Sequence, residues 1–92
     1  MVNFVIKKDG SQEPFDQEKI KRAVIGACKE AGLNETKQAE LAQSISQKIM
    51  EIFNGQEVVK SIELRDKILG ELEIMAPEAT AAWYNYEANK AK

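Results

Sequence analysis

Histidine is absent from this chain of 92 residues, and Cys28 is its only cysteine. A single cysteine cannot form an internal disulfide, and zinc sites in proteins are built mainly from cysteine and histidine. The sequence therefore excludes a zinc ribbon, and zinc-based catalysis, within this chain. We interpret Cys28 as a small buried residue and not as a redox centre, because it lies on an apolar helical stripe.

Long apolar runs and an excess of one charge are also missing. No apolar stretch approaches the roughly 20 residues that a membrane-spanning helix needs, and the N-terminal sequence lacks the apolar segment of a signal peptide. The 13 Lys and Arg residues nearly balance the 15 Asp and Glu residues, so the net charge is −2. Bulk electrostatics therefore favours neither nucleic acid nor a membrane as partner. We expect a cytoplasmic protein with one domain over residues 1–92.

Only five glycines and two prolines interrupt the chain, and the extended segments between them are short. β-branched and aromatic residues predict a strand over 3–7, and Asp9-Gly10 predicts a tight turn in which both residues take positive φ. A returning strand is expected over 11–14, where a proline ends it. A lone hairpin is marginal in water, so we expect residues 57–59 to add a third strand.

Apolar residues recur at helical spacing in four segments, 17–31, 36–53, 61–75 and from Pro77 onward. Asp16 is the expected N-cap of the first helix and Ser61 that of the third, whereas Gly32 should end the first. The residues expected on the buried stripes are Ile20, Ala23, Val24, Ala27 and Cys28, then Leu41, Ala42, Ile45, Ile49, Ile52 and Phe53, then Leu64, Ile68, Leu72 and Met75, and finally Ala79, Ala82, Trp83 and Tyr86.

The order of elements is thus β-β-α-α-β-α-α. The fold class that follows is α+β, a four-helix bundle capped by a small three-stranded β-sheet.

The joint between the hairpin and the first helix is where chemistry is expected. Free N–H groups and the macrodipole favour an anion at a helix N-terminus. Lys19 lies in the first turn, where a cation is unfavourable unless a bound phosphate reverses the penalty. Lys7 and Lys8 lie on the hairpin, and residues 13–15 offer backbone groups and an apolar surface beside them. These features predict a site for the phosphates and the base of a nucleotide.

The same residues also have a purely structural interpretation. Lysines commonly protect the edge of a hairpin against further pairing. Phe15 before the cap can form a hydrophobic staple. No glycine-rich phosphate loop and no Ser/His/Asp set occur in the sequence.

The pattern V-I-K-K-D-G-S-x-E-P-F-D-x-x-K-I over residues 5–20 closely resembles the opening of the ATP-cone. The ATP-cone is the allosteric nucleotide-binding domain of many ribonucleotide reductases and of the zinc-ribbon repressors of their genes. The resemblance extends from Phe4 to about residue 90 and includes the W-x-x-Y ending at residues 83–86. It implies the same sheet-capped four-helix fold and a regulatory, non-catalytic role.

The resemblance also implies a ligand and the residues that bind it. The ligand is ATP or dATP, with Mg²⁺, and the regulated partner is a ribonucleotide reductase or another protein such as a transcriptional repressor, with homo-oligomerisation as a further expectation. No direct binding to nucleic acid is expected. The implied phosphate-binding residues are Lys7, Lys8, Lys19 and Ser61, and those around the adenine and ribose are Val5, Glu13, Pro14, Phe15, Asp16 and Ile20.

Two departures from the family pattern keep an alternative open. Lys8 stands where the family usually has arginine, so a point charge replaces a planar fork. Glu87 and Ala88 stand where basic residues usually follow the second tyrosine, with Lys90 as the next cation. The alternative is a degenerate cone that binds no nucleotide and acts as a protein interaction module. A DNA-binding regulator and a nucleotide hydrolase are weaker hypotheses, because the net charge is negative and no general base or metal cluster is visible.

Overall fold

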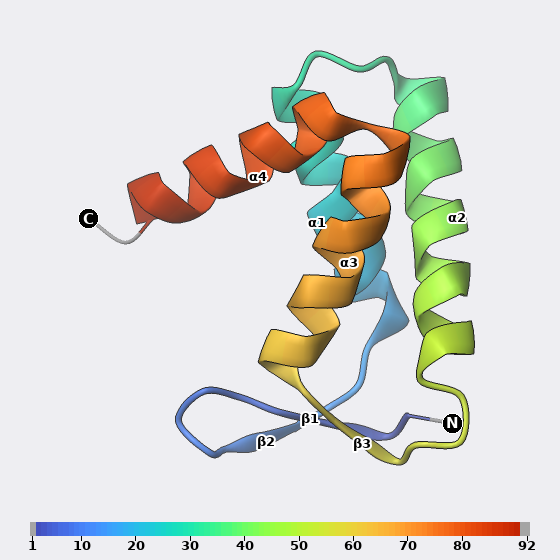
Figure 1. Cartoon of the computed structure of the whole chain (residues 1–92), viewed down its shortest axis with the longest axis vertical. Coiled ribbons are helices and arrows are strands. Elements are labelled where there is room, and N and C mark those ends of the chain that lie inside the picture. The colour runs from blue at the N-terminus through green and yellow to red at the C-terminus, as the bar shows by residue number, and fades with distance from the viewer. Residues whose placement is uncertain (1, 91–92) are drawn as a thin grey trace.

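A three-stranded sheet lies across one end of four helices in the computed structural model, which describes residues 2–90 (Figure 1). The fold is α+β with the order β-β-α-α-β-α-α, which confirms the predicted class. The elements in chain order are β1 (Phe4–Ile6), β2 (Gln12–Pro14), α1 (Gln17–Glu30), α2 (Glu35–Ile52), β3 (Val58–Lys60), α3 (Ser61–Met75) and α4 (Pro77–Lys90).

The strand β1 is the centre of the sheet, whose order is β2-β1-β3. It pairs antiparallel with β2 and parallel with β3, with Val5 opposite Val59 in the parallel register. Both valines are buried beneath the helices. Because β1 and β3 run in the same direction, the hairpin loop after β1 and the first turn of α3 leave the sheet at the same edge.

The hairpin loop spans residues 7–11 and differs from the two-residue turn that the sequence predicts. Within this loop Gly10 takes a positive φ, of 87°, whereas Asp9 does not. The Gly10 N–H donates to the Lys7 carbonyl over 2.9 Å. The Asp9 carboxylate accepts hydrogen bonds from the backbone and hydroxyl of Ser11, which lower its pKa. Asp9 therefore stabilises the loop through its side chain, which favours a longer turn than the predicted one.

The helix boundaries confirm most of the expected caps. Asp16 is the N-cap of α1, with its carboxylate accepting from the Glu18 N–H at 3.0 Å, and Gly32 follows α1 with a φ of 83°. The prediction for Ser61 was wrong, because α3 begins at Ser61 itself and the cap position is Lys60. Lys60 is also the last residue of β3, so the strand continues into the helix with no residue between them to act as a side-chain cap.

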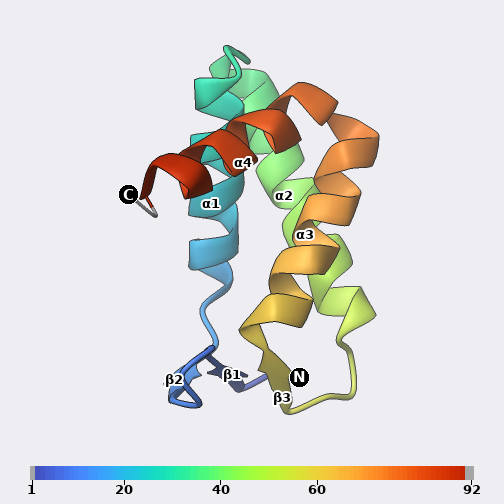
Figure 2. The ribbon, with the colours of Figure 1, turned by 60° about the vertical axis from the view of Figure 1, so that its left-hand side comes forward.

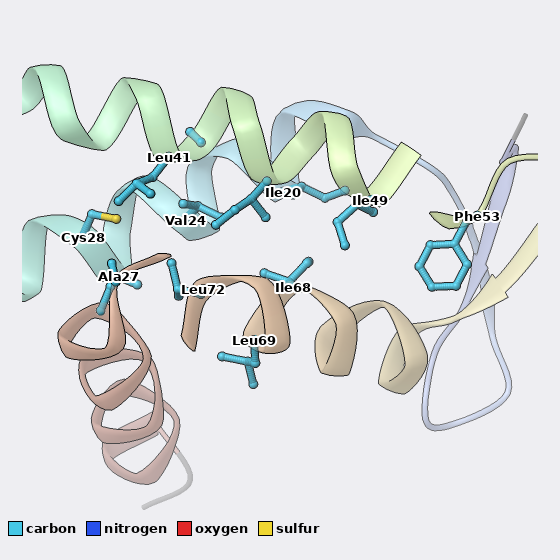
Figure 3. Packing of buried hydrophobic residues seen from close by; sticks show 14 of the residues in the cluster. Ile20, Val24, Ala27, Cys28, Leu41, Ile49, Phe53, Ile68, Leu69 and Leu72 are labelled. Carbon is cyan, nitrogen blue, oxygen red and sulfur yellow. The ribbon is translucent and has the colours of Figure 1, made fainter. Parts of the chain in front are cut away.

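The hydrophobic core lies between α1, α2 and α3 and is closed by the sheet at one end (Figure 3). Val24, Ile45 and Leu72, one from each helix, have no exposed surface. Helix α4 packs on α1 and α3 at the other end of the bundle (Figure 2). None of the four helices within residues 2–90 combines the length and the apolar character needed to cross a bilayer.

Four residues expected on buried stripes are exposed in the structure, namely Ala23, Ile52, Met75 and Tyr86. Only Ala76 separates α3 from α4, so α4 turns away sharply and its C-terminal half extends beyond the bundle (Figure 1). No other described element covers the last turn of α3 or the far side of α4. Leu69 and Thr80, which the stripes omitted, are buried where α3 and α4 approach each other.

The core makes a direct prediction for stability. Replacement Leu72→Ala should lower the free energy of unfolding by about 2–5 kcal/mol, because it removes buried methyl groups and leaves a cavity. Ile74→Ala, on the same helix but 78% exposed, is the matched control and should change stability by less than about 0.5 kcal/mol. Urea denaturation measures both, and equal effects of the two substitutions would contradict the assignment of this core.

Candidate functional site

Three of the predicted site residues meet at the joint between the hairpin and α1. The ammonium nitrogens of Lys7 and Lys19 each lie 3.7 Å from the same oxygen, Oε2 of Glu13. Their side chains are 53% and 58% exposed, so an anion from solvent can reach both. Lys7 follows β1, Glu13 is the middle residue of β2, and Lys19 lies in the first turn of α1. The tertiary structure thus brings together two cations that are far apart along the chain.

The N-terminus of α1 already holds a carboxylate. The Asp16 side chain accepts from the Glu18 N–H, and its second oxygen lies 3.7 Å from the Arg22 guanidinium. The Lys19 N–H donates to the Asp16 carbonyl. Since Asp16 occupies this end of the helix, the lysine side chains, rather than free helix N–H groups, supply most of the positive charge available to a ligand.

A groove of about 1030 Å³ lies beside this joint, bounded by α1, α3 and α4 with the hairpin residue Lys8 at its border. Ala23 and Gly26 of α1 leave room along one wall, and the Trp83 ring forms part of another. Ligand pockets typically have volumes of about 300–1,000 Å³ and combine apolar walls with a few polar groups. The charged residues that line this groove are Lys8, Arg22, Lys29, Glu30, Arg65 and Glu87.

The remaining predicted site residues lie in different environments. Val5 and Ile20 are core residues, buried behind the lysines of the joint. Phe15 is half-buried and packs against the core, whereas Pro14 is exposed at the end of β2. Ser61 is half-buried at the first position of α3. Among the predicted residues, Lys8 alone also lines the groove.

Arg65 is the groove residue that sequence reasoning missed. Its Nε and Nη2 donate to the two carboxylate oxygens of Glu87, over 2.8 and 2.5 Å, and its Cζ lies 5.8 Å from the centre of the Tyr84 ring. Arg65 and Glu87 are 22 positions apart on different helices, so no local pattern pairs them. The acidic residue that replaces a basic one in the family pattern therefore has a specific partner on α3.

The ion pair changes the acidity of Glu87. The hydrogen bonds from Arg65 lower the pKa of Glu87 to about 2, a hydrogen bond with Trp83 and the charge of Lys8 act in the same direction, and partial burial opposes them. Burial raises the pKa of the Cys28 thiol, which keeps that group protonated in the core. Within residues 2–90, no group of three or more histidine, cysteine, aspartate or glutamate side chains is placed to hold a metal ion. The side chain of Lys90 lies outside the described part of the chain.

Comparison with known proteins agrees with this architecture. A family model described as the ATP cone domain matches residues 3–88. The chain is 34% identical over 73 residues to the transcriptional repressor NrdR of Persephonella marina. The aligned region covers 79% of this chain and 47% of that protein. It is also 31% identical over 86 residues to the transcriptional repressor NrdR of Syntrophus aciditrophicus. That aligned region covers 91% of this chain and 54% of that protein. The chain spans about half the length of the curated relatives it matches.

The fold and the joint define a small α+β domain in which a lysine-bearing hairpin leads into a helical bundle. The family match extends over nearly all of the described chain, from the first strand to the last turns of α4. The chain belongs to the ATP-cone family.

Acid should weaken the contact between α3 and α4. The pKa of Glu87 is depressed from 4.5 to about 2 in the folded state, so its stabilisation is present above pH 4.5 and is lost as the pH falls toward 2. The two side chains are 31% and 37% exposed, and solvent screening limits the pair to about 1 kcal/mol. Glu87→Gln should therefore be less stable than the wild type at pH 7, and this difference should be clearly smaller at pH 2, as measured by urea denaturation. A difference that is the same at both pH values would show that this pair does not contribute.

Proposed function

We propose that this chain is a regulatory ATP/dATP-binding domain that senses adenine nucleotides and modulates a partner such as a ribonucleotide reductase or a transcriptional repressor. The observation that carries this proposal is the convergence of Lys7 and Lys19 on one carboxylate, beside a groove that Lys8 and Trp83 line. Membership of the ATP-cone family and the names of the relatives support it. The regulatory role implies no chemical step, and residues 1–92 act as one unit.

The phosphates of the nucleotide bind at the three lysines of the hairpin and α1. The ammonium groups of Lys7 and Lys19 now share Glu13, at distances of 3.7 Å that leave the pairing weak. A triphosphate carries more negative charge than one carboxylate and can contact both ammonium groups at once. The hydroxyl of Ser61 reaches the phosphate end. A Mg²⁺ ion would be held mainly by the phosphates themselves.

The base lies against the apolar walls of the groove. A planar ring matches the flat surface of Trp83 and the space above Ala23 and Gly26. Glu13, Pro14 and Phe15 border the ribose through the backbone of the hairpin end, and Asp16 orients the start of α1. Val5 and Ile20 act from the core, where their packing positions the strand and helix that carry the lysines.

One observation favours the alternative of an interaction module without nucleotide. Ile74 at the end of α3 and Tyr84 in the middle of α4 are large side chains that are mostly exposed. A partner could cover them without any ligand in the groove. Pull-down of a purified ribonucleotide reductase with and without ATP separates the two functions, because nucleotide dependence is expected only of the sensor.

Lysine substitutions test the nucleotide site directly. Lys7→Ala and Lys19→Ala should each raise the Kd for ATP and dATP about tenfold, which corresponds to about 1.4 kcal/mol for a lost charge-assisted contact. Both side chains are exposed, so the melting temperature should not change. Lys37→Ala, in the first turn of α2 at the far end of the bundle, is the matched control (Figure 1). Calorimetric titration with Mg²⁺ measures the affinities, and a wild-type chain that binds neither nucleotide at millimolar concentration would refute the proposal.

A further inference from the structure

The carboxylate of Glu87 lies at the groove together with two cations that suit phosphate. It forms a two-point ion pair with Arg65, and its charge interacts with that of Lys8. All three residues line the groove, from α4, α3 and the hairpin loop respectively. Trp83, one turn before Glu87, lines the same groove.

Arg65 contributes a planar guanidinium to this groove, and one edge of that guanidinium is already bound to the Glu87 carboxylate. A guanidinium binds a carboxylate and a phosphate through the same pair of parallel N–H groups. While Glu87 accepts from Nε and Nη2, this edge of the guanidinium is not available for two-point binding of a ligand, and Nη1 lies 3.5 Å from Oδ1 of Asp66. Lys8 belongs both to the predicted phosphate-binding set and to the lining of the groove. A polyphosphate that reaches Lys8 therefore also comes close to Glu87.

We propose that Glu87 is a specificity-determining residue of the groove, which competes with ligand phosphates for Arg65 and Lys8 and so disfavours ligands in proportion to their negative charge. This inference rests on the proposed function, since it concerns the same nucleotide site. An anionic ligand either displaces Glu87 from Arg65 or lies beside an uncompensated carboxylate. Neither penalty applies to an uncharged adenine nucleoside, so Glu87 sets the ratio between the affinities for ATP and for adenosine.

Glu87→Gln tests this competition, because it keeps the size of the side chain and removes its charge. We expect the Kd for ATP with Mg²⁺ to fall about tenfold, and the Kd for adenosine to change less than about twofold. The double variant Glu87→Gln/Arg65→Gln should bind ATP more weakly than Glu87→Gln alone, because it lacks the guanidinium that the loss of the Glu87 charge releases. Glu30→Gln is the matched control, since it removes a carboxylate from the α1 wall of the same groove and should produce a smaller gain.

Distinct results would overturn the inference and the proposed function. Unchanged or weaker ATP binding by Glu87→Gln, an equal gain for adenosine, or equal ATP affinity of Glu87→Gln with and without Arg65→Gln overturns the role of Glu87 and leaves the proposed function intact. If neither the wild type nor any variant binds ATP or adenosine, the proposed function fails. Titration with inorganic tripolyphosphate then tests whether Glu87 competes with phosphate for the cations. Tighter binding of tripolyphosphate by Glu87→Gln supports competition for the cations, and unchanged binding refutes it. Circular dichroism melts of each variant verify that it is folded.

Discussion

The parallel pairing of β1 with β3 is the contact on which the position of the site depends. It joins residues 4–6 to residues 58–60, across the whole length of α1 and α2. A hairpin of two three-residue strands is too small to be stable by itself. Once β3 is added, Val5 and Val59 are buried under the helices, and the hairpin loop lies at the same edge as the start of α3. The lysines of the hairpin thereby gain a fixed position next to the groove.

Each main cation of the site is matched with a carboxylate of the same chain. Glu13 lies between two lysines, Asp16 lies near Arg22, and Glu87 binds Arg65. An anionic ligand must therefore exchange one set of ionic partners for another, and the affinity depends on the difference between the two sets. The pairs also differ in strength. Those around Glu13 are long and exposed, whereas the pair of Glu87 with Arg65 is short and two-pointed, so the hairpin cations are the more easily released.

Helix α4 is the element for which the structure adds most to what the sequence predicts. Its start is anchored in the core by Ala76, which precedes it, and by Ala79 in its first turn. From Ala81 to Asn89 its side chains are exposed or only partly buried, and the contact with Arg65 holds this half against α3. Glu87 thus makes a defined interhelical contact with Arg65 at the border of the groove.

The sequence by itself determined the order of the elements, the capping of α1 by Asp16, the end of that helix at Gly32, and the lysine-bearing hairpin. These features depend on chemistry within a few residues, namely turn preferences, side-chain caps and helical periodicity. Only the tertiary structure decided that Lys7 and Lys19 meet at Glu13, that Arg65 pairs with Glu87, and that Tyr86 and Ala23 are exposed. The physical reason is that these outcomes depend on strand pairing and on the sharp turn at Ala76. Neither strand pairing nor the angle between two consecutive helices is expressed in the spacing of apolar residues, so local periodicity does not encode them.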